Sequence, residues 1–302
     1  MVVATGFFDG VHLGHRFILR QLVEEARRRN GESMVVTFWP HPRNVLQDDA
    51  RNLRLLSSMD EKKALIRGIG VDRIEVLPFS RTFSRLTTEE YLRDYVAGKF
   101  GGDAVLVGYD NRIGSDLCTP ERTAEIARGL GLDVIRPESF LSDSGVVISS
   151  TKIRALLSGG EVEKANAMLG YEYQLYGVVV SGNRLGHTIG FPTANMQLYE
   201  PLKLVPGHGV YLVRVETLGN VYAGMCNIGV RPTLGSGNAV TIETNIFDFD
   251  EDIYGLDIRL SFISKIRDEV KFNDFSLLAS QLEKDRELCR SICSEKCLSL
   301  QK

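Results

Sequence analysis

A glycine-rich turn between a short apolar segment and a helical pattern is the feature that most constrains this chain. Apolar residues 2–4 precede Thr5-Gly-Phe-Phe-Asp-Gly-Val-His-Leu-Gly-His15, and apolar residues then recur at helical spacing. The order strand, glycine turn, helix is typical of α/β proteins that bind phosphate. Glycines let the backbone approach an anion closely, and the helix that follows offers free N–H groups and the positive end of its dipole.

Two histidines stand three residues apart where this helix is expected to begin. His12 and His15 can face one ligand there, and their imidazoles can donate hydrogen bonds to a phosphate in a charged transition state. The chain has only five histidines, so the pair favours phosphoryl or nucleotidyl transfer over coincidence. Two other phosphate motifs are excluded, because the chain has no G-x-x-x-x-G-K-[ST] loop and these glycines lack the G-x-G-x-x-G spacing.

The region that follows alternates between apolar strands and helices up to about residue 135. Capping boxes, in which Ser or Thr is followed three residues later by Glu, mark helix starts at Ser58 and Thr87. The alternation predicts a doubly wound parallel α/β sheet with helices on both faces. Ligands of such sheets bind beyond the carboxyl ends of the strands, where the glycine turn is expected. The expected strands are residues 33–38, 73–77, 104–108 and 133–135.

A hydroxyl-rich segment with two cations, Val146-Val-Ile-Ser-Ser-Thr-Lys-Ile-Arg154, follows this alternation. Its hydroxyl groups can cap the next helix, whereas Lys152 and Arg154 fall in the first turn, where positive charge opposes the helix dipole. That placement indicates a bound anion. An ordinary capped helix with solvated cations explains the segment equally well when it is taken alone.

The pattern changes after residue 170. Short strand-like segments separated by turn residues replace the alternation with helices, and a long helix is expected from about residue 275 to 298. Strands at this spacing predict an antiparallel β-barrel or sandwich. We therefore expect two domains, residues 1–170 and 171–302. The expected strands of the second domain are residues 173–180, 209–216, 220–227, 240–246 and 256–262.

A glycine-rich segment between the first two of these strands, residues 181–195, is suited to cover phosphates. Thr193 and Asn195 at its end offer neutral oxygens of the kind that bind Mg²⁺ together with a nucleotide. Glu243 lies in the middle of an apolar strand, where a carboxylate either faces solvent or acts as a base. The pattern alone favours the solvent-facing alternative. The glycines of the segment are Gly182, Gly186 and Gly190.

Composition limits the partners. A net charge of −3 and a pI near 6.0 argue against a broad surface for nucleic acid or anionic membranes. No apolar run approaches the roughly 18 residues that span a bilayer, and residues 1–4 lack the basic start of a signal peptide. The five cysteines include Cys289, Cys293 and Cys297 on one expected helix face, where packing is favoured over a metal site. A cytoplasmic protein is expected.

The motifs together carry a resemblance. H-x-G-H after a glycine turn, followed by I-S-S-T-x-I-R, resembles the nucleotidylyltransferase superfamily. G-F-P-T-A-N, then N-x-G-x-R-P-T from Asn227, then E-x-x-x-F-D-F-x-x-D-x-Y-G from Glu243, resemble the riboflavin kinase domain. The whole chain resembles the bacterial bifunctional riboflavin kinase/FAD synthetases. The resemblance implies that the second domain phosphorylates riboflavin to FMN with ATP, and that the first adenylylates FMN to FAD and releases pyrophosphate.

The resemblance also implies roles for individual residues. Glu243 would take the proton of the ribityl 5′-hydroxyl, and Thr193 and Asn195 would bind Mg²⁺. The other implied catalytic residues are His12, His15 and Arg154. The implied nucleotide-binding residues are Gly6, Phe8, Gly10, Ser149, Ser150, Thr151, Gly182, Gly186, Gly190, Thr193 and Asn195. The implied flavin-binding residues are His41, Asp110 and Asn111.

One departure from the family pattern keeps alternatives open. Asn111 and Ile113 stand where the family usually has two aromatic residues. The chain is therefore either an enzyme with both activities, a riboflavin kinase with an impaired adenylyltransferase domain, or a regulator that binds flavin or nucleotide without catalysis. The expected partners are small molecules, with neither nucleic acid nor membrane, and the expected state is a monomer or a weak homo-oligomer.

Overall fold

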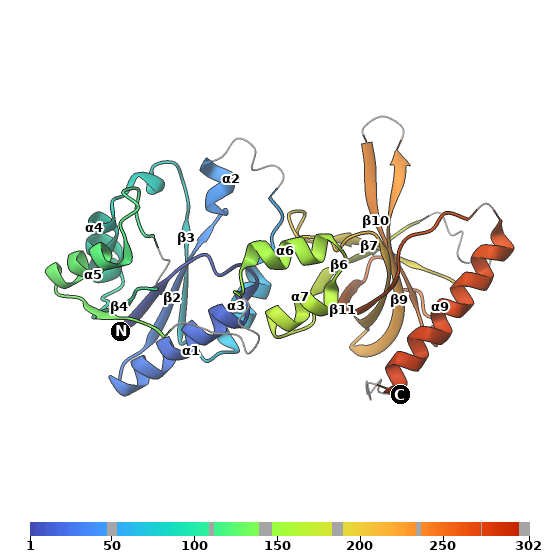
Figure 1. Ribbon diagram of the computed structural model, residues 1–302, viewed down its shortest axis with the longest axis horizontal. Coiled ribbons are helices and arrows are strands. Elements are labelled where there is room, and N and C mark those ends of the chain that lie inside the picture. The colour runs from blue at the N-terminus through green and yellow to red at the C-terminus, as the bar shows by residue number, and fades with distance from the viewer. Residues whose placement is uncertain are drawn as a thin grey trace. The chain divides into compact units, whose positions relative to one another are not determined.

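The protein consists of two compact units, Met1–Ser150 and Thr151–Lys302, in a computed structural model (Figure 1). The structure describes residues 1–46, 53–108, 112–138, 147–182, 190–233, 237–272 and 274–295. The division falls earlier in the chain than the expected boundary at residue 170. Helices α6 (Ser150–Ser158) and α7 (Val162–Leu169) are thereby grouped with the second unit, apart from the first residue of α6.

The first unit contains a five-stranded sheet in the order β3-β2-β1-β4-β5, in which every neighbouring pair is parallel. Its central strand β1 pairs on one edge with β2, at Val2 opposite Ser33, and on the other edge with β4, at Val2 opposite Ala104. The predicted parallel α/β sheet is confirmed. The strands are β1 (Val2–Thr5), β2 (Ser33–Trp39), β3 (Arg73–Pro78), β4 (Ala104–Leu106) and β5 (Asp133–Ile135).

Helices cover both faces of this sheet, because its strands are apolar on both sides (Figure 1). One face packs against α1 and α3, whose Leu22 and Ile66 are fully buried. The other face packs against the segment from α4 to α5, where Leu92 and Ala127 are fully buried. The helices of the unit are α1 (Leu13–Arg28), α2 (Pro42–Leu46), α3 (Met59–Arg67), α4 (Thr88–Tyr91) with the π-helix η4 (Leu92–Lys99), and α5 (Pro120–Gly129).

Both predicted capping boxes are present. The Ser58 hydroxyl accepts the backbone N–H of Glu61, whose carboxylate accepts the backbone N–H of Ser58 in return. Thr87 and Glu90 repeat this exchange at the start of α4. These local bonds satisfy N–H groups that the first helical turn leaves without partners, so the sequence alone fixes where α3 and α4 begin.

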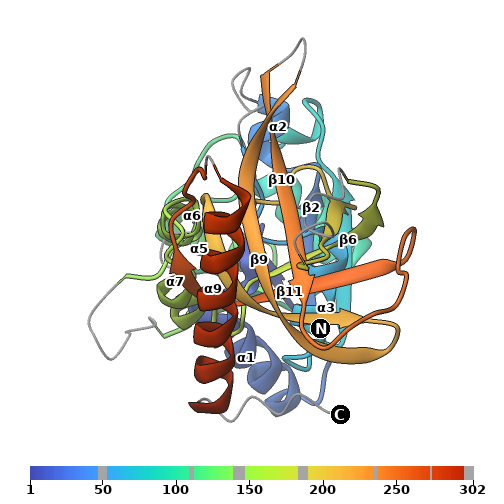
Figure 2. The ribbon, with the colours of Figure 1, turned by 90° about the vertical axis from the view of Figure 1, so that its right-hand side faces the viewer.

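The second unit contains a closed antiparallel barrel in the order β10-β7-β6-β11-β8-β9, seen from its side in Figure 2. The predicted barrel is confirmed, with one strand more than the sequence pattern indicated. The additional strand is β7. It directly follows Pro192-Thr193, and its sequence, which includes Asn195, shows neither the alternation nor the β-branched residues that predict strands. The strands are β6 (Gln174–Val180), β7 (Ala194–Leu198), β8 (Gly209–Thr217), β9 (Asn220–Thr233), β10 (Gly237–Ile246) and β11 (Asp257–Arg267).

Helix α9 (Phe275–Glu295) packs against the outside of this barrel (Figure 2). Cys289 and Cys293 are buried there against Met225 and other apolar side chains, as the packing interpretation of these thiols expected. An ion pair also joins the helix to β11, because Arg267 donates through Nε and Nη2 to the buried Asp285. Among the described residues, no group of three or more His, Cys, Asp or Glu side chains could hold a metal ion.

Two candidate active sites

The glycine turn of the first unit adopts a conformation that explains its composition. Phe8 has φ 51° and Gly10 has φ 76°, both in the left-handed region, within the short passage from β1 to α1. A Cβ on Gly6 would lie 2.8 Å from the Phe8 ring. The Phe8 ring therefore occupies the space that a side chain at residue 6 would need.

Hydrogen bonds from two distant segments of the chain hold this turn in place. The Asp9 carboxylate accepts the backbone N–H groups of Leu56 and Ser57, and the Gly10 N–H donates to the Ser57 hydroxyl at 3.0 Å. The Ser150 hydroxyl donates to the carbonyl oxygen of Asp9, also at 3.0 Å. Ser150 belongs to the second predicted motif, so the structure brings the two motifs of this half together at one turn.

The two histidines form a stacked pair at the start of α1. Their ring centroids lie 3.6 Å apart with an interplanar angle of 16°. His12 caps the helix, because its Nδ1 accepts the backbone N–H of His15 at 3.3 Å. A neutral His12 that accepts through Nδ1 carries its proton on Nε2, which is then available as a donor.

Burial keeps both imidazoles neutral near pH 7. It lowers the pKa of His12 to about 4, and the nearby Asp9 carboxylate only partly opposes the effect. Burial also lowers the pKa of His15 well below its ordinary 6.5, and the charges of His12 and Lys62 lower it further. Among the described residues, the buried Nδ1 of His15 has no hydrogen-bond partner.

A cavity of about 530 Å³ opens beside this turn, at the carboxyl ends of the strands, as expected. Ile113, one of the two departures from the family pattern, lines it together with aromatic rings. His41 lies against one of these rings, with centroids 3.8 Å apart between His41 and Phe7. Asp110 and Asn111 lie outside the described residues. The aromatic lining residues are Phe7, Phe38, Phe79, Phe83 and Tyr91.

The remaining predicted residues of this half lie around the start of α6. Ser149 directly precedes the helix, the exposed Thr151 lies in its first turn, and the half-buried Arg154 lies one turn further along. Thr151 and Arg154 belong to the second compact unit. A hydrogen bond ties Ser150 of this segment to the glycine turn.

The polar site of the barrel is built by strand pairing. Glu243 of β10 lies opposite Asn195 of β7 on one side and opposite Asn227 of β9 on the other. Directly opposite residues of antiparallel strands point to the same face of the sheet, so the three side chains form a row. The three residues come from three separate sequence motifs, and the barrel register brings them together.

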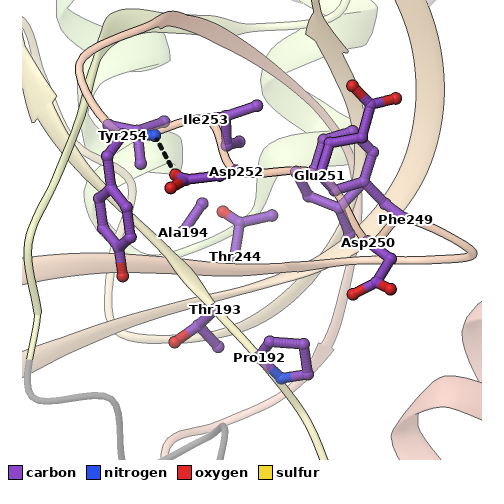
Figure 3. A pocket seen from close by; sticks show the side chains of 12 residues that line it. Pro192, Thr193, Ala194, Thr244, Phe249, Asp250, Glu251, Asp252, Ile253 and Tyr254 are labelled. Carbon is purple, nitrogen blue, oxygen red and sulfur yellow. Dashed lines mark hydrogen bonds between the residues drawn. The ribbon is translucent and has the colours of Figure 1, made fainter.

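Two cavities share Thr193 as a lining residue, and one of them includes Asn227 and Glu243 of this row. One, of about 260 Å³, is also lined by Asn227, Glu243 and apolar residues of α9. The other, of about 270 Å³, is lined by Pro192 and by the acidic loop Asp250–Asp252 (Figure 3). Thr193 therefore lines two cavities that both contain carboxylates, Glu243 in the first and the acidic loop in the second.

The predicted glycines support this site in different ways. A Cβ on Gly182 would lie 2.2 Å from Nδ2 of Asn195, so only glycine fits beside that amide. Gly190 has φ 80°, a conformation that favours glycine. Gly186 lies outside the described residues.

Three residues at this site were missing from the sequence prediction. Asn245 lines the cavity of Glu243, and its Nδ2 donates to the carbonyl oxygen of Pro192 at 2.7 Å. Its position two residues after Glu243 on the same strand face could have revealed it. Arg267 and Glu269 also line this cavity, but Arg267 ends β11 and Glu269 follows it, and no local pattern connects them with the motifs.

Comparison with known proteins gives matches over nearly the whole chain. A family model described as FAD synthetase matches residues 1–152, and one described as riboflavin kinase matches residues 169–293. The bifunctional riboflavin kinase/FMN adenylyltransferase of Bacillus subtilis (strain 168) is 36% identical over 290 residues, covering 95% of this chain and 90% of the relative. The protein of the same name from Escherichia coli (strain K12) is 35% identical over 294 residues, with coverages of 96% and 91%.

Among solved structures, a crystal structure described as a macrolide-efflux protein from Streptococcus pneumoniae matches with a TM-score of 0.88. It is 33% identical, and the match covers 96% of this chain and 93% of that chain. In the part of the chain that the structure describes, none of the helices combines the length and the hydropathy needed to cross a bilayer.

Proposed function

The chain belongs to the family of bifunctional riboflavin kinase/FMN adenylyltransferases, and from that premise we propose how its two units divide the chemistry. The enzyme phosphorylates riboflavin to FMN and adenylylates FMN to FAD, with ATP as the donor in both reactions. The barrel carries the first reaction and the parallel-sheet unit the second. One observation supports the residue assignments most strongly: each unit has its own polar site beside a cavity.

In the barrel, Glu243 acts as the base. The 5′-hydroxyl oxygen of riboflavin attacks the γ-phosphorus of ATP, the bond from that phosphorus to the bridging oxygen breaks, and ADP leaves. The hydroxyl proton passes to the Glu243 carboxylate, because a primary alcohol is a weak nucleophile until a base accepts its proton. The cavity that Glu243 shares with Asn227 holds the flavin, and the cavity beside Asp250–Asp252 holds the nucleotide, so Thr193 lies where the two substrates meet.

Thr193 and Asn195 fit a magnesium site. Mg²⁺ prefers oxygen ligands and is usually bound by one or two protein groups together with substrate phosphates and water. Thr193 lines both cavities, and Asn195 lies opposite Glu243 in the strand register, so two neutral oxygens stand at the expected position of the phosphates. When bound, the ion neutralises charge on the phosphates of ATP.

In the parallel-sheet unit, no protein nucleophile is needed. A phosphate oxygen of FMN attacks the α-phosphorus of ATP, the bond to the β-phosphate oxygen breaks, and pyrophosphate leaves. His12 donates from Nε2 to the phosphates, and its partner His15 provides a second imidazole in the stacked pair. The glycine turn contributes the backbone N–H groups, while Ser149, Ser150, Thr151 and Arg154 bind the leaving phosphates.

The large aromatic cavity is the flavin pocket of this second reaction. Ile113 takes the place of one family aromatic, yet five other rings line the same cavity. Aromatic faces stack on planar ligands such as the flavin ring, so the cavity supports retained adenylylation of FMN rather than an impaired domain. His41 supports the pocket through its contact with Phe7, and Asp110 and Asn111 complete the proposed flavin contacts.

The proposal extends to the setting of the enzyme. We place it in the cytoplasm, where ATP is abundant, acting on small molecules as a monomer or a weak homo-oligomer. The near-neutral net charge of −3 supports a role without nucleic acid or a membrane surface.

A time course tests both activities in one experiment. The purified protein is incubated with riboflavin, ATP and Mg²⁺, and the three flavins are separated by chromatography. FMN should form first and FAD later. Accumulation of FMN without FAD would contradict the proposed flavin pocket, and formation of neither product by folded protein would contradict the catalytic assignments in the barrel.

A further inference from the structure

Lys62 is a buried ammonium group close to the glycine turn, and neither proposed reaction uses it. It lies on α3 with 1% of its surface exposed, although burial is rare for lysine. Its Nζ lies 3.6 Å from the centroid of the Phe7 ring.

Packing alone does not explain a lysine here. Ile66, one helical turn further along α3, is fully buried in the apolar core, so the same helix face accepts an apolar side chain. Burial lowers the pKa of Lys62 to about 8, although the Asp9 charge opposes this shift. The fold therefore tolerates a poorly solvated cation at a position where a side chain such as Met or Leu would pack without that penalty.

The ammonium group of Lys62 interacts with two residues of the proposed adenylylation site, Phe7 and His15. It rests on the ring of Phe7, which lines the large cavity and also contacts His41. Its charge also acts on His15, where it disfavours protonation of the imidazole. Among the described residues, the other titratable groups that act on this cluster are Asp9, which favours a charged His12 and a charged Lys62, and His12, whose protonated form would disfavour protonation of His15.

We propose that Lys62 is a positioning residue for the adenylylation of FMN, which acts through the ring of Phe7 and through the stacked histidines rather than by touching substrate. The proposal rests on the assignment of His12 and His15 to this reaction. The fixed positive charge holds the Phe7 ring by a cation–π contact. It also opposes protonation of His15 when the negatively charged triphosphate arrives, so the imidazole pair keeps one protonation state and one hydrogen-bond pattern throughout binding.

The variant Lys62→Met removes the charge and keeps a long apolar side chain, and Lys63→Met on the same helix is the matched control. We expect Lys62→Met to lower the kcat of FAD formation from supplied FMN by about tenfold to a hundredfold, because misplaced catalytic groups lose rate of this order. Formation of FMN from riboflavin, measured in the same preparation, should stay at the wild-type rate. Lys63→Met should leave both rates unchanged.

Two further readouts separate positioning from a structural role. Trp39 is the single tryptophan of the chain and lies at the end of β2, so its fluorescence reports unfolding of the first unit alone. Its unfolding midpoint should be equal or higher in Lys62→Met, since a buried charge has been removed. The acid limb of the pH profile of FAD formation should move to higher pH, because the pKa of His15 rises when the Lys62 charge is lost.

Three results would overturn the proposal. The first is a wild-type rate of FAD formation in Lys62→Met. The second is a loss of FAD formation that is accompanied by a lowered unfolding midpoint and explained by it. The third is a pH profile of FAD formation whose acid limb does not move. The variant His12→Ala is measured in the same assay. It shows whether the role of Lys62 or the assignment of the whole adenylylation site has failed. If His12→Ala abolishes FAD formation and Lys62→Met does not, the site assignment stands and the role of Lys62 is wrong.

Discussion

The two proposed active sites of this enzyme are assembled in opposite ways. In the parallel-sheet unit, His12 and His15 lie within four residues of one another, and one turn of α1 stacks their rings. In the barrel, Asn195, Glu243 and Asn227 are far apart in the sequence and meet through the pairing of three strands. A local motif fixes the first geometry, whereas the second depends on the register of the whole barrel.

The surroundings of the sites differ as well. The histidine pair lies with Lys62 and Asp9 in a buried cluster of polar groups, so desolvation sets its protonation states. Glu243 is half-buried and borders an open cavity. Changes at the first site should therefore respond to charge and pH, and changes at the second to the presence of the base and to the integrity of the barrel.

The largest effect is expected at Glu243. Glu243→Gln keeps the size of the side chain but removes the base, so the kcat of FMN formation should fall by about 10²- to 10⁴-fold. FAD formation from supplied FMN should not change, because it uses the other unit. Both rates are measured by chromatography of the flavins. A kinase rate within twofold of wild type, or an equal loss of both activities, would contradict the division of labour.

His12→Ala should give the reciprocal result with a somewhat smaller loss. Removal of one hydrogen-bond donor to a charged transition state typically lowers kcat by about 10²- to 10³-fold. FAD formation should fall by this factor while riboflavin phosphorylation persists. His208 of the second unit is a control histidine, and His208→Ala should leave FAD formation intact.

The ion pair between α9 and the barrel should matter for stability in the second unit alone. Asp285→Ala leaves the largely buried Arg267 without its carboxylate, which costs about 3 kcal/mol or more of unfolding free energy. Urea should then abolish kinase activity at a lower concentration, while the unfolding of the first unit, followed by Trp39 fluorescence, stays unchanged. Glu283→Ala on the same helix breaks an exposed pair and should cost only about 0.3–0.5 kcal/mol.

Acid should destabilise the first unit through His12. Its pKa is about 4 in the folded protein, whereas an unfolded chain titrates near 6.5, so the unfolded state binds more protons between these values. Above pH 6.5, the neutral state of His12 makes its full contribution to the unfolding free energy. About 3 kcal/mol of this contribution is lost as the pH falls to 4. Urea titrations followed by Trp39 fluorescence measure this loss, which should be smaller in His12→Ala. An equal pH dependence in both proteins would contradict the burial of a neutral His12.

Much of the first unit could be predicted from the sequence because its signals are local. The capping boxes at Ser58 and Thr87, the apolar strands and the histidine spacing each act within a few residues, and each is present in the structure. The sequence predicted that the two phosphate motifs serve one site, but it could not predict the hydrogen bond from Ser150 to the Asp9 carbonyl, because these residues lie far apart in the chain.

The rest depends on contacts that no local pattern encodes. Lys62 and Lys63 are adjacent lysines in the sequence, and only the packing of α3 makes one of them buried. Strand β7 lacks the usual alternation, because its residues serve the site and pair on both sides within the barrel. Arg267 joins the cavity of Glu243 from a different strand, so its place there follows from the register and not from its sequence neighbours.

The most direct test of two independent sites is a mixture of two variants. Glu243→Gln lacks the proposed kinase base and His12→Ala lacks the proposed adenylylation donor, so neither alone should convert riboflavin to FAD at an appreciable rate. Mixed with riboflavin, ATP and Mg²⁺, the two proteins should form FAD, because FMN made by one is adenylylated by the other. Failure of the mixture to form FAD, when Glu243→Gln still adenylylates supplied FMN and His12→Ala still produces it, would contradict the account of two separate sites.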